Sequence, residues 1–281
     1  MKIFERSGDL EFFLDSCRKD NKAVSLVPTM GGLHDGHLSL VEKAQSLSDV
    51  VVVSIFVNPT QFATGEDFDS YPKTFSNDKF LLEERGIDVL FIPSKDEIYP
   101  NGTLSNYDVG EIGRLLCGSS RPKHFNGVAQ VVNRLFDIVK PNYSIFGEKD
   151  YQQLLIIKSL VKNNNLNVSI ESVSTQREDD GLAMSTRNKY LSAKDRMKAP
   201  LFYQQLINAK TAIEQGNPIE FVTQKALSEL SVNFEVEYFE VLNANNLTQI
   251  ATNTAEIIII SAIRLGETRL IDNIVFRRSN V

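Results

Sequence analysis

Along the first two thirds of the chain, short continuous hydrophobic runs alternate with stretches in which hydrophobic residues recur at helical spacing. Short β-branched runs, such as 50–57, are typical of strands that are buried on both faces of a sheet. Other stretches, such as 37–47, repeat apolar residues at the spacing of a helix face. The pattern predicts strands at 23–27, 50–57, 88–92, 143–146 and 167–173. It predicts helices at 128–139, 151–161, 37–47 and 75–85, the last closed by Gly86 as a C-cap.

Strands that alternate with helices pair in parallel, because each helix returns the chain across the sheet in a right-handed crossover. We therefore predict an α/β fold, with a Rossmann-like doubly wound parallel sheet in a first domain at 1–175. Beyond that point the pattern predicts helices at 193–214 and 218–230, then strands at 234–242, 255–263 and 269–275. We expect these elements to form a second, smaller α+β domain at 176–281 that acts as a lid.

Composition narrows the class of protein. The 281 residues are 42% hydrophobic and 23% charged, which is ordinary for a globular protein and argues against a disordered chain. The net charge of −6 argues against broad binding to nucleic acid or membranes. The first residues carry charge too early for a secretory signal, and the apolar runs are far shorter than the ~20 residues that span a bilayer. Two distant cysteines, Cys17 and Cys117, predict neither a disulfide framework nor a thiolate zinc site, so we expect a cytoplasmic protein.

Doubly wound sheets bind ligands where the carboxyl ends of strands meet the amino ends of helices. After the first predicted strand comes Met30-Gly31-Gly32-Leu33-His34-Asp35-Gly36-His37. The glycines allow close backbone approach, and the amino end of the following helix favours a phosphate. The segment is neither a P-loop nor a Gly-x-Gly-x-x-Gly turn. Because His34 and His37 are three residues apart at a helix start, we expect their imidazoles on the same side.

This segment has two other interpretations. A glycine-rich turn often only reverses the chain, and a histidine near a helix start often only caps it. A zinc site built from His34, Asp35 and His37 is the weaker alternative, because no third, separated ligand is evident.

Amide side chains follow the second predicted strand. Asn58 and Gln61 can bind hydroxyl groups or a carboxylate without adding charge, although an Asn-Pro turn explains Asn58 equally well. Arg121 belongs to a loop whose cations are candidates for contact with a polyphosphate; the alternative is a solvent-exposed loop.

Two later segments carry cations beside polar groups. Gly147-Glu148-Lys149-Asp150 follows a predicted strand, and its acids complement the helix dipole, whereas Lys149 is unfavourable there unless an anion binds beside it. Ser185-Thr186-Arg187 offers two hydroxyls and a planar guanidinium, which suit phosphate oxygens. A helix N-cap beside a surface arginine is the alternative for this second segment.

Seven segments resemble one enzyme family in the order in which they occur. They are 28–37, 53–62, 66–74, 121–128, 146–154, 180–191 and 269–273. Together they resemble the pantothenate synthetase (pantoate–β-alanine ligase) family. His-Asp-Gly-His at 34–37 also resembles the HIGH signature of the nucleotidyltransferase superfamily. Two positions depart from the common pattern: Thr186 replaces a serine, and Cys117 replaces a glutamate.

The resemblance implies a reaction. Pantoate and β-alanine condense to pantothenate while ATP becomes AMP and pyrophosphate, through an enzyme-bound pantoyl adenylate. It also implies Mg²⁺, whose ligands the sequence does not identify, and a homodimer formed by the first domain. The implied partners are small molecules, with no nucleic acid and no membrane.

The resemblance also assigns residues. His34, His37 and Lys149 are the implied catalytic groups, with His37 as the family's proton donor. The implied pantoate ligands are Gln61 and Gln153, with Gln61 also close to β-alanine; Asn58 and Arg121 are further substrate-binding candidates. The implied ATP site comprises Met30, Gly31, Gly32, Leu33, His34, Asp35, Gly36, His37, Gly147, Glu148, Lys149, Asp150, Gln176, Met184, Ser185, Thr186 and Arg187.

Two other functions compete with this interpretation. An adenylyltransferase that stops at nucleotide transfer would not require both Gln61 and Gln153. A nucleotide-binding regulatory module without turnover would have no need of paired histidines together with Lys149 and the Ser-Thr-Arg cluster. Formation of AMP only when pantoate and β-alanine are both supplied separates these functions from the ligase.

Overall fold

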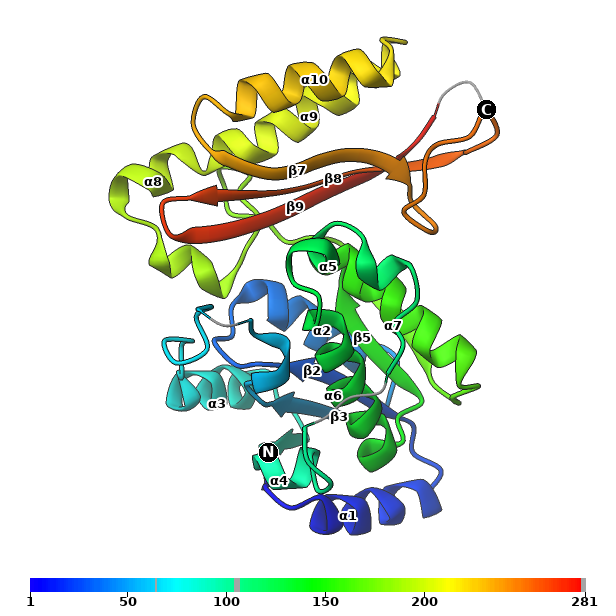
Figure 1. Ribbon diagram of the computed structural model, residues 1–281. Coiled ribbons are helices and arrows are strands. Elements are labelled where there is room, and N and C mark those ends of the chain that lie inside the picture. Colours follow the sequence, from blue (N-terminus) through cyan, green and yellow to red (C-terminus); the bar gives the residue numbers. More distant parts are fainter. Residues whose placement is uncertain (64, 104–106, 279–281) are drawn as a thin grey trace. The chain divides into compact units, whose positions relative to one another are not determined.

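The chain folds into two compact units. The computed structural model describes residues 1–63, 65–103 and 107–278 (Figure 1). The first unit comprises 1–148 and 153–174, and the second comprises 149–152 and 175–281. The short segment 149–152 therefore packs with the second unit, although its neighbours in sequence belong to the first.

The first unit is built on six parallel strands in the order β1-β4-β3-β2-β5-β6. From β2 the chain adds β3 and β4 on one side, and later β5 and β6 on the other. The strand order thus reverses between β2 and β5, which is where doubly wound sheets bind ligands. The predicted fold class is confirmed. The strands are β1 (Lys2–Phe4), β2 (Val24–Thr29), β3 (Val50–Ile55), β4 (Val89–Phe91), β5 (Tyr143–Gly147) and β6 (Ser169–Val173).

Helices cover both faces of this sheet (Figure 1). Val24 and Leu26 of β2 face the helices α1, α6 and α7, whereas Val27 faces α2 and α3, as the two-residue period of a strand requires. The α-helices are α1 (Ser7–Lys19), α2 (Asp35–Gln45), α3 (Phe75–Glu84), α4 (Lys95–Ile98), α5 (Cys117–Ser120), α6 (His124–Val139) and α7 (Tyr151–Asn163). Short 3₁₀ turns are η1 (Pro59–Gln61), η2 (Ile112–Arg114) and η3 (Glu148–Asp150).

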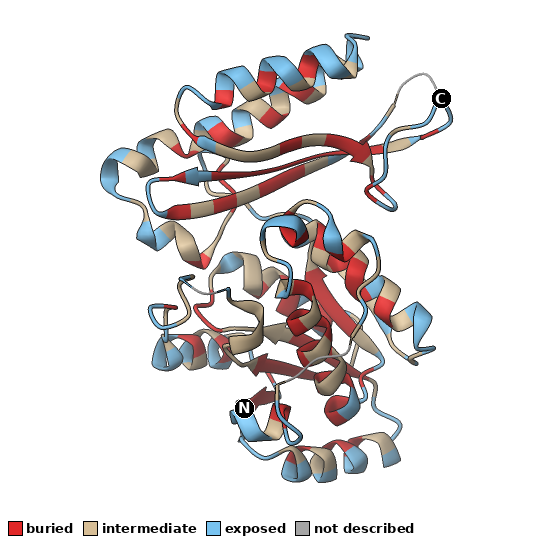
Figure 2. Ribbon diagram, viewed as in Figure 1, coloured by how far each residue is buried: buried red, intermediate tan, exposed pale blue. Residues whose placement is uncertain are grey.

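The second unit packs helices against a three-stranded antiparallel sheet. Apolar residues of α9 and α10 contact buried residues of β7, β8 and β9, and the buried stripes on these helices are visible in Figure 2. The sheet order is β7-β8-β9. The elements are η4 (Thr186–Tyr190), α8 (Ala193–Lys198), α9 (Pro200–Glu214), α10 (Ile219–Leu230), β7 (Glu235–Asn243), β8 (Glu256–Leu265) and β9 (Thr268–Arg277).

The structure corrects two details of the predicted elements. The predicted helix at 193–214 is two helices, because Pro200 has no N–H to continue the first and occupies the first turn of the second. The hydrophobic pattern of α1, with Leu10, Leu14 and Cys17 buried on one face, was overlooked, as was the edge strand β1. Gly86 does adopt the predicted left-handed conformation after α3. Within the described ranges, the helices are all too short or too polar to cross a bilayer.

Candidate active site

The glycine-rich turn leaves the carboxyl end of β2 in a conformation that requires glycine. Gly31 and Gly32 have φ of +81° and +66°, in the left-handed region that side chains disfavour. A Cβ on Gly31 would lie 3.1 Å from an oxygen of Asp78 and 3.1 Å from the side chain of Ile55. The turn is therefore packed closely against its neighbours.

A buried carboxylate holds this turn. Asp78 on α3 is only 1% exposed. Its Oδ2 accepts a hydrogen bond from the N–H of Gly32 at 2.9 Å, and its Oδ1 accepts one from the N–H of Leu33 at 2.9 Å. The hydroxyl of Thr74 also donates to Oδ1, at 3.0 Å. Asp78 is not among the site residues predicted from the sequence; its one local signal is a threonine four residues before it, at the start of a helix.

The two histidines lie side by side at the start of α2. Their ring centroids are 4.1 Å apart, which confirms that the imidazoles share one side. His34 is the N-cap, and its Nδ1 accepts from the N–H of Gly36 at 3.1 Å. Nδ1 of His37 accepts from the N–H of His34 at 3.4 Å. Capping therefore occurs, and it has a chemical consequence: a neutral imidazole that accepts at Nδ1 carries its hydrogen on Nε2 and donates from there.

Asn58 and Gln61 are joined by hydrogen bonds beyond the end of β3. The Asn58 amide is 1% exposed and donates to Oε1 of Gln61 at 3.2 Å and to the carbonyl of Gly127 at 3.1 Å. Nε2 of Gln61 lies 2.9 Å from the sulfur of Met30. Asn58 also accepts from the N–H of Thr60, as an Asn-Pro turn predicts. The structure thus links Gln61 to the glycine-rich turn through Met30 and orients it through Asn58.

Arg121 is clamped inside the first unit, so the solvent-exposed alternative for this side chain is wrong. Its guanidinium forms a two-pronged ion pair with Glu66, with Nη2 2.6 Å from Oε2, and Nη2 also donates to the Gln61 carbonyl at 3.1 Å. Burial alone raises the pKa of Glu66, but the hydrogen bond and charge of Arg121 outweigh it, so this pKa lies below its ordinary value. Nδ1 of His124 is 2.7 Å from the same carbonyl and must donate there. His124, to which no role was assigned, therefore helps to hold the backbone of Gln61.

The carboxyl end of β5 lies beside β2 and carries the predicted Gly147 and Glu148. The Ser172 hydroxyl donates to Oε1 of Glu148 at 2.8 Å, so this acid is tied to the end of β6. Gln153 is half-buried near the start of α7. In the part of the chain that the structure describes, its amide makes no side-chain hydrogen bond, in contrast to Gln61.

The second unit holds the other predicted residues. The ammonium group of Lys149 lies 3.9 Å from Oδ2 of the exposed Asp150, and the Lys149 side chain is mostly buried. Gln176 and Met184 are neighbours, because the Met184 N–H donates to the Gln176 carbonyl at 2.9 Å. Ser185 caps η4, and its hydroxyl accepts from the N–H of Arg187 at 3.3 Å. Thr186 is buried and Arg187 is half-buried.

Comparisons with known proteins agree over the whole chain. A family model described as pantoate-beta-alanine ligase matches residues 2–275. The pantothenate synthetase of Vesicomyosocius okutanii is 49% identical over 280 residues, 100% of this chain and 99% of that protein. The pantothenate synthetase of Thermus thermophilus has a TM-score of 0.91 at 40% identity, covering 98% of this chain and 99% of its own. The pantoate-beta-alanine ligase of Francisella tularensis, solved in complex with beta-gamma ATP and beta-alanine, has a TM-score of 0.82 at 38% identity, covering 98% and 97%.

The chain belongs to the pantoate–β-alanine ligase family. The ATP-dependent condensation of pantoate with β-alanine is the reaction of this family. The resemblance drawn from the seven ordered segments is therefore confirmed, and so is the predicted ligase function. The individual site residues remain predictions.

The candidate metal ligands of the described residues are dispersed. Within the described ranges, no three His, Cys, Asp or Glu side chains gather into a cluster able to hold a metal ion. Mg²⁺ keeps several waters and commonly binds through substrate phosphates with one or two carboxylates. The described residues thus offer no dedicated cage for a metal ion.

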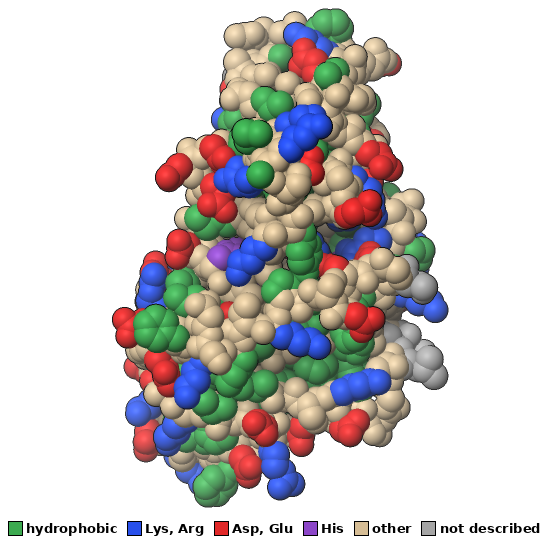
Figure 3. All heavy atoms as spheres, turned by 90° about the vertical axis from the view of Figure 1, so that its left-hand side faces the viewer, with side chains coloured by type: hydrophobic (Ala, Val, Ile, Leu, Met, Phe, Trp, Pro, Cys, Tyr) green, Lys and Arg blue, Asp and Glu red, His purple; other side chains and the backbone are tan. Residues whose placement is uncertain are grey.

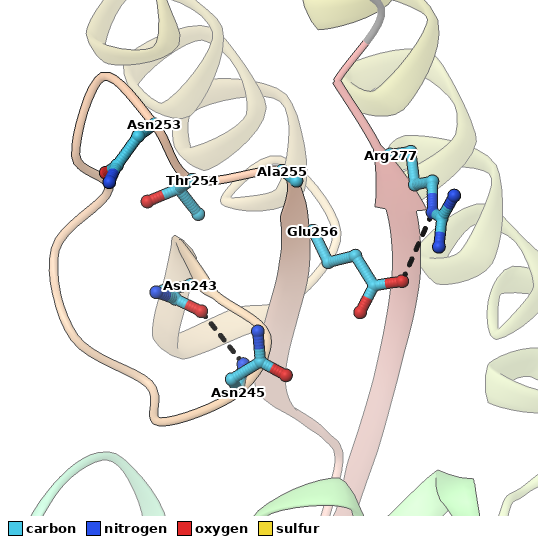
Figure 4. Close-up of a pocket in the computed structure, with 7 residues that line it drawn as sticks. All are labelled: Asn243, Asn245, Asn253, Thr254, Ala255, Glu256 and Arg277. Carbon is cyan, nitrogen blue, oxygen red and sulfur yellow. Dashed lines mark hydrogen bonds and ion pairs between the residues drawn. The ribbon is translucent and has the colours of Figure 1, made fainter. Parts of the chain in front are cut away.

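Other surface features involve none of these residues. A pocket in the second unit is lined, among the described residues, by Asn243, Asn245, Asn253, Thr254, Ala255, Glu256 and Arg277 (Figure 4). None of them belongs to the predicted site, and Arg277 and Glu256 pair with each other at 3.3 Å. On the face drawn in Figure 3, acidic and basic side chains are interspersed. That face shows no single-sign patch of the kind that binds polyanions.

Proposed function

We propose that this chain makes pantothenate in two steps. In the first, a pantoate carboxylate oxygen attacks the α-phosphorus of ATP, and pyrophosphate leaves. In the second, the β-alanine amine attacks the acyl carbon of the pantoyl adenylate, the C–O bond to AMP breaks, and the amine loses a proton as the amide forms. The observation that carries the proposal is the pair of adjacent imidazoles at 34 and 37, whose Nδ1 atoms both accept backbone N–H groups, on a pinned turn where the strand order reverses.

The chemistry of the first step requires fixed donors more than a nucleophile on the protein. Negative charge builds on the phosphate oxygens as pyrophosphate departs, so catalysis consists chiefly of positioning and electrostatic stabilisation. His34 and His37 supply neutral N–H donors, and Lys149 and Arg187 supply positive charge. Each donor that is oriented before the reaction avoids reorganisation during it. Water must be excluded, because it hydrolyses the mixed anhydride.

Pantoate recognition is assigned to Gln61 and Gln153. Amides hold hydroxyl and carboxylate groups without offering a competing nucleophile. Asn58 orients the side-chain amide of Gln61. Arg121 and His124 hold the backbone carbonyl of Gln61. We therefore assign Asn58 and Arg121 as positioning residues for Gln61.

Three further properties complete the proposal. Mg²⁺ enters as part of the MgATP substrate and supplies positive charge to the phosphates. The chain forms a homodimer through its first unit, which size-exclusion chromatography with light scattering tests. Its compartment is the cytoplasm, consistent with two buried cysteines, Cys17 and Cys117, that form no disulfide.

Isotope exchange tests the order of the steps. With pantoate, MgATP and labelled pyrophosphate but no β-alanine, label will enter ATP, because adenylation is reversible and complete without the amine. Omitting pantoate is the control and abolishes exchange. Exchange that strictly requires β-alanine would show a concerted route without a discrete adenylate. Exchange without pantoate would favour a different nucleotidyl transfer.

A further inference from the structure

The segment 269–273 is shared with the family but has no role in the reaction described so far. It forms part of β9, where Asp272 and Asn273 are 2% and 6% exposed within a sheet of apolar strands. Buried polar side chains are costly unless they are hydrogen-bonded. Both side chains therefore need partners.

The partner of Asn273 is the backbone of Lys149. Nδ2 of Asn273 donates to the Lys149 carbonyl at 3.0 Å, across 124 positions of sequence. Lys149 lies in η3, a turn of three residues that is too short to fix its own geometry by helical hydrogen bonds. An external hydrogen bond to this carbonyl therefore constrains the backbone from which the lysine side chain leaves.

Asp272 holds the same strand in place. Nη1 and Nη2 of Arg177 donate to its two oxygens at 2.6 Å and 3.0 Å, and Nη1 also donates to the Gly181 carbonyl at 3.1 Å. The Arg177 guanidinium stacks on the Tyr203 ring, 3.4 Å from its centroid. Burial raises the pKa of Asp272, and the hydrogen bonds and charge of Arg177 oppose that rise only in part.

We propose that Asn273 is a positioning residue for Lys149: its carboxamide holds the Lys149 carbonyl and thereby aims the ammonium group at the ATP phosphates. The proposal rests on the role given to Lys149 above. A lysine is a point charge on a flexible four-carbon stem, so the position of its backbone decides where the charge can reach. Asp272, clamped by Arg177, keeps the strand that carries Asn273 in register.

Four variants test this role. Asn273→Ala removes the donor, and Asn273→Asp keeps the side-chain volume but places an oxygen against the carbonyl. Ser261→Ala is the matched control. The hydroxyl of the buried Ser261 donates to the Tyr238 carbonyl of the same sheet at 2.8 Å, and this variant removes that hydrogen bond. Lys149→Ala is combined with Asn273→Ala in a double-mutant cycle.

Single-turnover formation of the adenylate is the first measurement. We expect both Asn273 variants to slow it by about 10–10²-fold, the scale of a displaced catalytic group, while ATP binding changes by about threefold at most. Ser261→Ala will stay near the wild-type rate. In the Lys149→Ala background, Asn273→Ala will add no further loss, because its effect passes through the lysine. The proposal is overturned if the Asn273 variants slow adenylation no more than Ser261→Ala does. It is also overturned if Asn273→Ala slows adenylation further in the Lys149→Ala background.

Lysine labelling gives a readout that does not depend on turnover. Partial acetylation followed by mass spectrometry compares Lys149 with the exposed Lys225 of the same molecule. We expect the Asn273 variants to change the reactivity of Lys149 relative to Lys225, and Ser261→Ala to leave it unchanged. If Lys149→Ala keeps the wild-type adenylation rate, the catalytic role of Lys149 fails and labelling alone decides the positioning role. Unchanged reactivity of Lys149 in both Asn273 variants overturns it.

Discussion

Replacing Asp78 by asparagine removes one charge and one acceptor from the centre of the glycine-rich turn. The carboxylate now accepts from Gly32, Leu33 and Thr74, and asparagine can offer only one oxygen to these three donors. Its amide N–H₂ must then face one backbone N–H. Because the site is 1% exposed, water cannot replace the lost acceptor.

The cost follows from that hydrogen-bond count. A buried donor without a partner costs about 1–3 kcal/mol, and the two remaining bonds together lose about 1 kcal/mol of the extra strength of a charged acceptor. Relief of the buried charge offsets part of this sum. We expect a net loss of about 2–3 kcal/mol, equivalent to a melting temperature lowered by about 4–12 °C for a unit of this size.

The loss of function should accompany the loss of stability and should persist in protein that remains fully folded. The turn ends at His34, so a turn that is no longer pinned lets both imidazoles move. We expect Asp78→Asn to slow single-turnover adenylation by on the order of 10²-fold at a temperature where the protein is fully folded.

Asp88→Asn provides the matched control. Asp88 also accepts from a backbone N–H, that of Val51 at 3.0 Å, but it is exposed and lies at the amino end of the sheet. We expect it to cost less than about 1 kcal/mol and to leave adenylation unchanged. If Asp78→Asn adenylates at the wild-type rate, or loses no more stability than Asp88→Asn, the role assigned to the Asp78 carboxylate is wrong.

Three further predictions follow from the site. His37→Ala and Lys149→Ala should each slow adenylation by on the order of 10²–10³-fold with little change in melting temperature; lost stability with normal adenylation would contradict the catalytic assignment. Gln153→Ala should raise the KM for pantoate several-fold, from a loss of about 0.5–1.5 kcal/mol, and leave that for ATP nearly unchanged; equal increases would indicate damage to the fold. Because the folded pKa of Glu66 lies below its ordinary 4.5, its contribution to stability is complete above that pH and is lost as the pH falls through the folded value. The melting-temperature difference between wild type and Glu66→Gln should therefore shrink only in acid, and a difference that stays constant to pH 3 would refute the ion-pair account.

The fold was predictable because its signals are local. Buried strands and helix faces each carry a short hydrophobic period, so β3 begins at Val50 as predicted and ends two residues early. The single helix predicted at 193–214 was wrong, because the helical hydrophobic period runs on through Pro200, where the structure divides it into two helices. The grouping of loops at the carboxyl ends of β2, β3 and β5 then followed from topology, without any knowledge of side-chain contacts.

The contacts that hold those loops were not predictable from the sequence. Asp78 is 46 residues from Gly32, and Asn273 is 124 residues from Lys149. A hydrogen bond at such separation leaves no periodic trace, because only the folded chain brings donor and acceptor together. Arg121 illustrates the same limit: the sequence indicated a cation for a polyphosphate or an exposed loop, but gave no sign of its ion pair with Glu66, 55 residues away.

Three contacts made by buried polar side chains share one arrangement. Each binding segment is a polar loop or turn, and each is held by a buried side chain. Asp78 at the glycine-rich turn and Asn273 at Lys149 come from distant elements, whereas Asn58 caps the turn that contains Gln61. An apolar residue at any of these buried positions would avoid the cost of desolvating a polar group. What the polar residue supplies in return is one fixed orientation of a binding or catalytic group, which lowers the reorganisation required during adenylation. The variants above should therefore lose adenylation activity even under conditions where they remain folded.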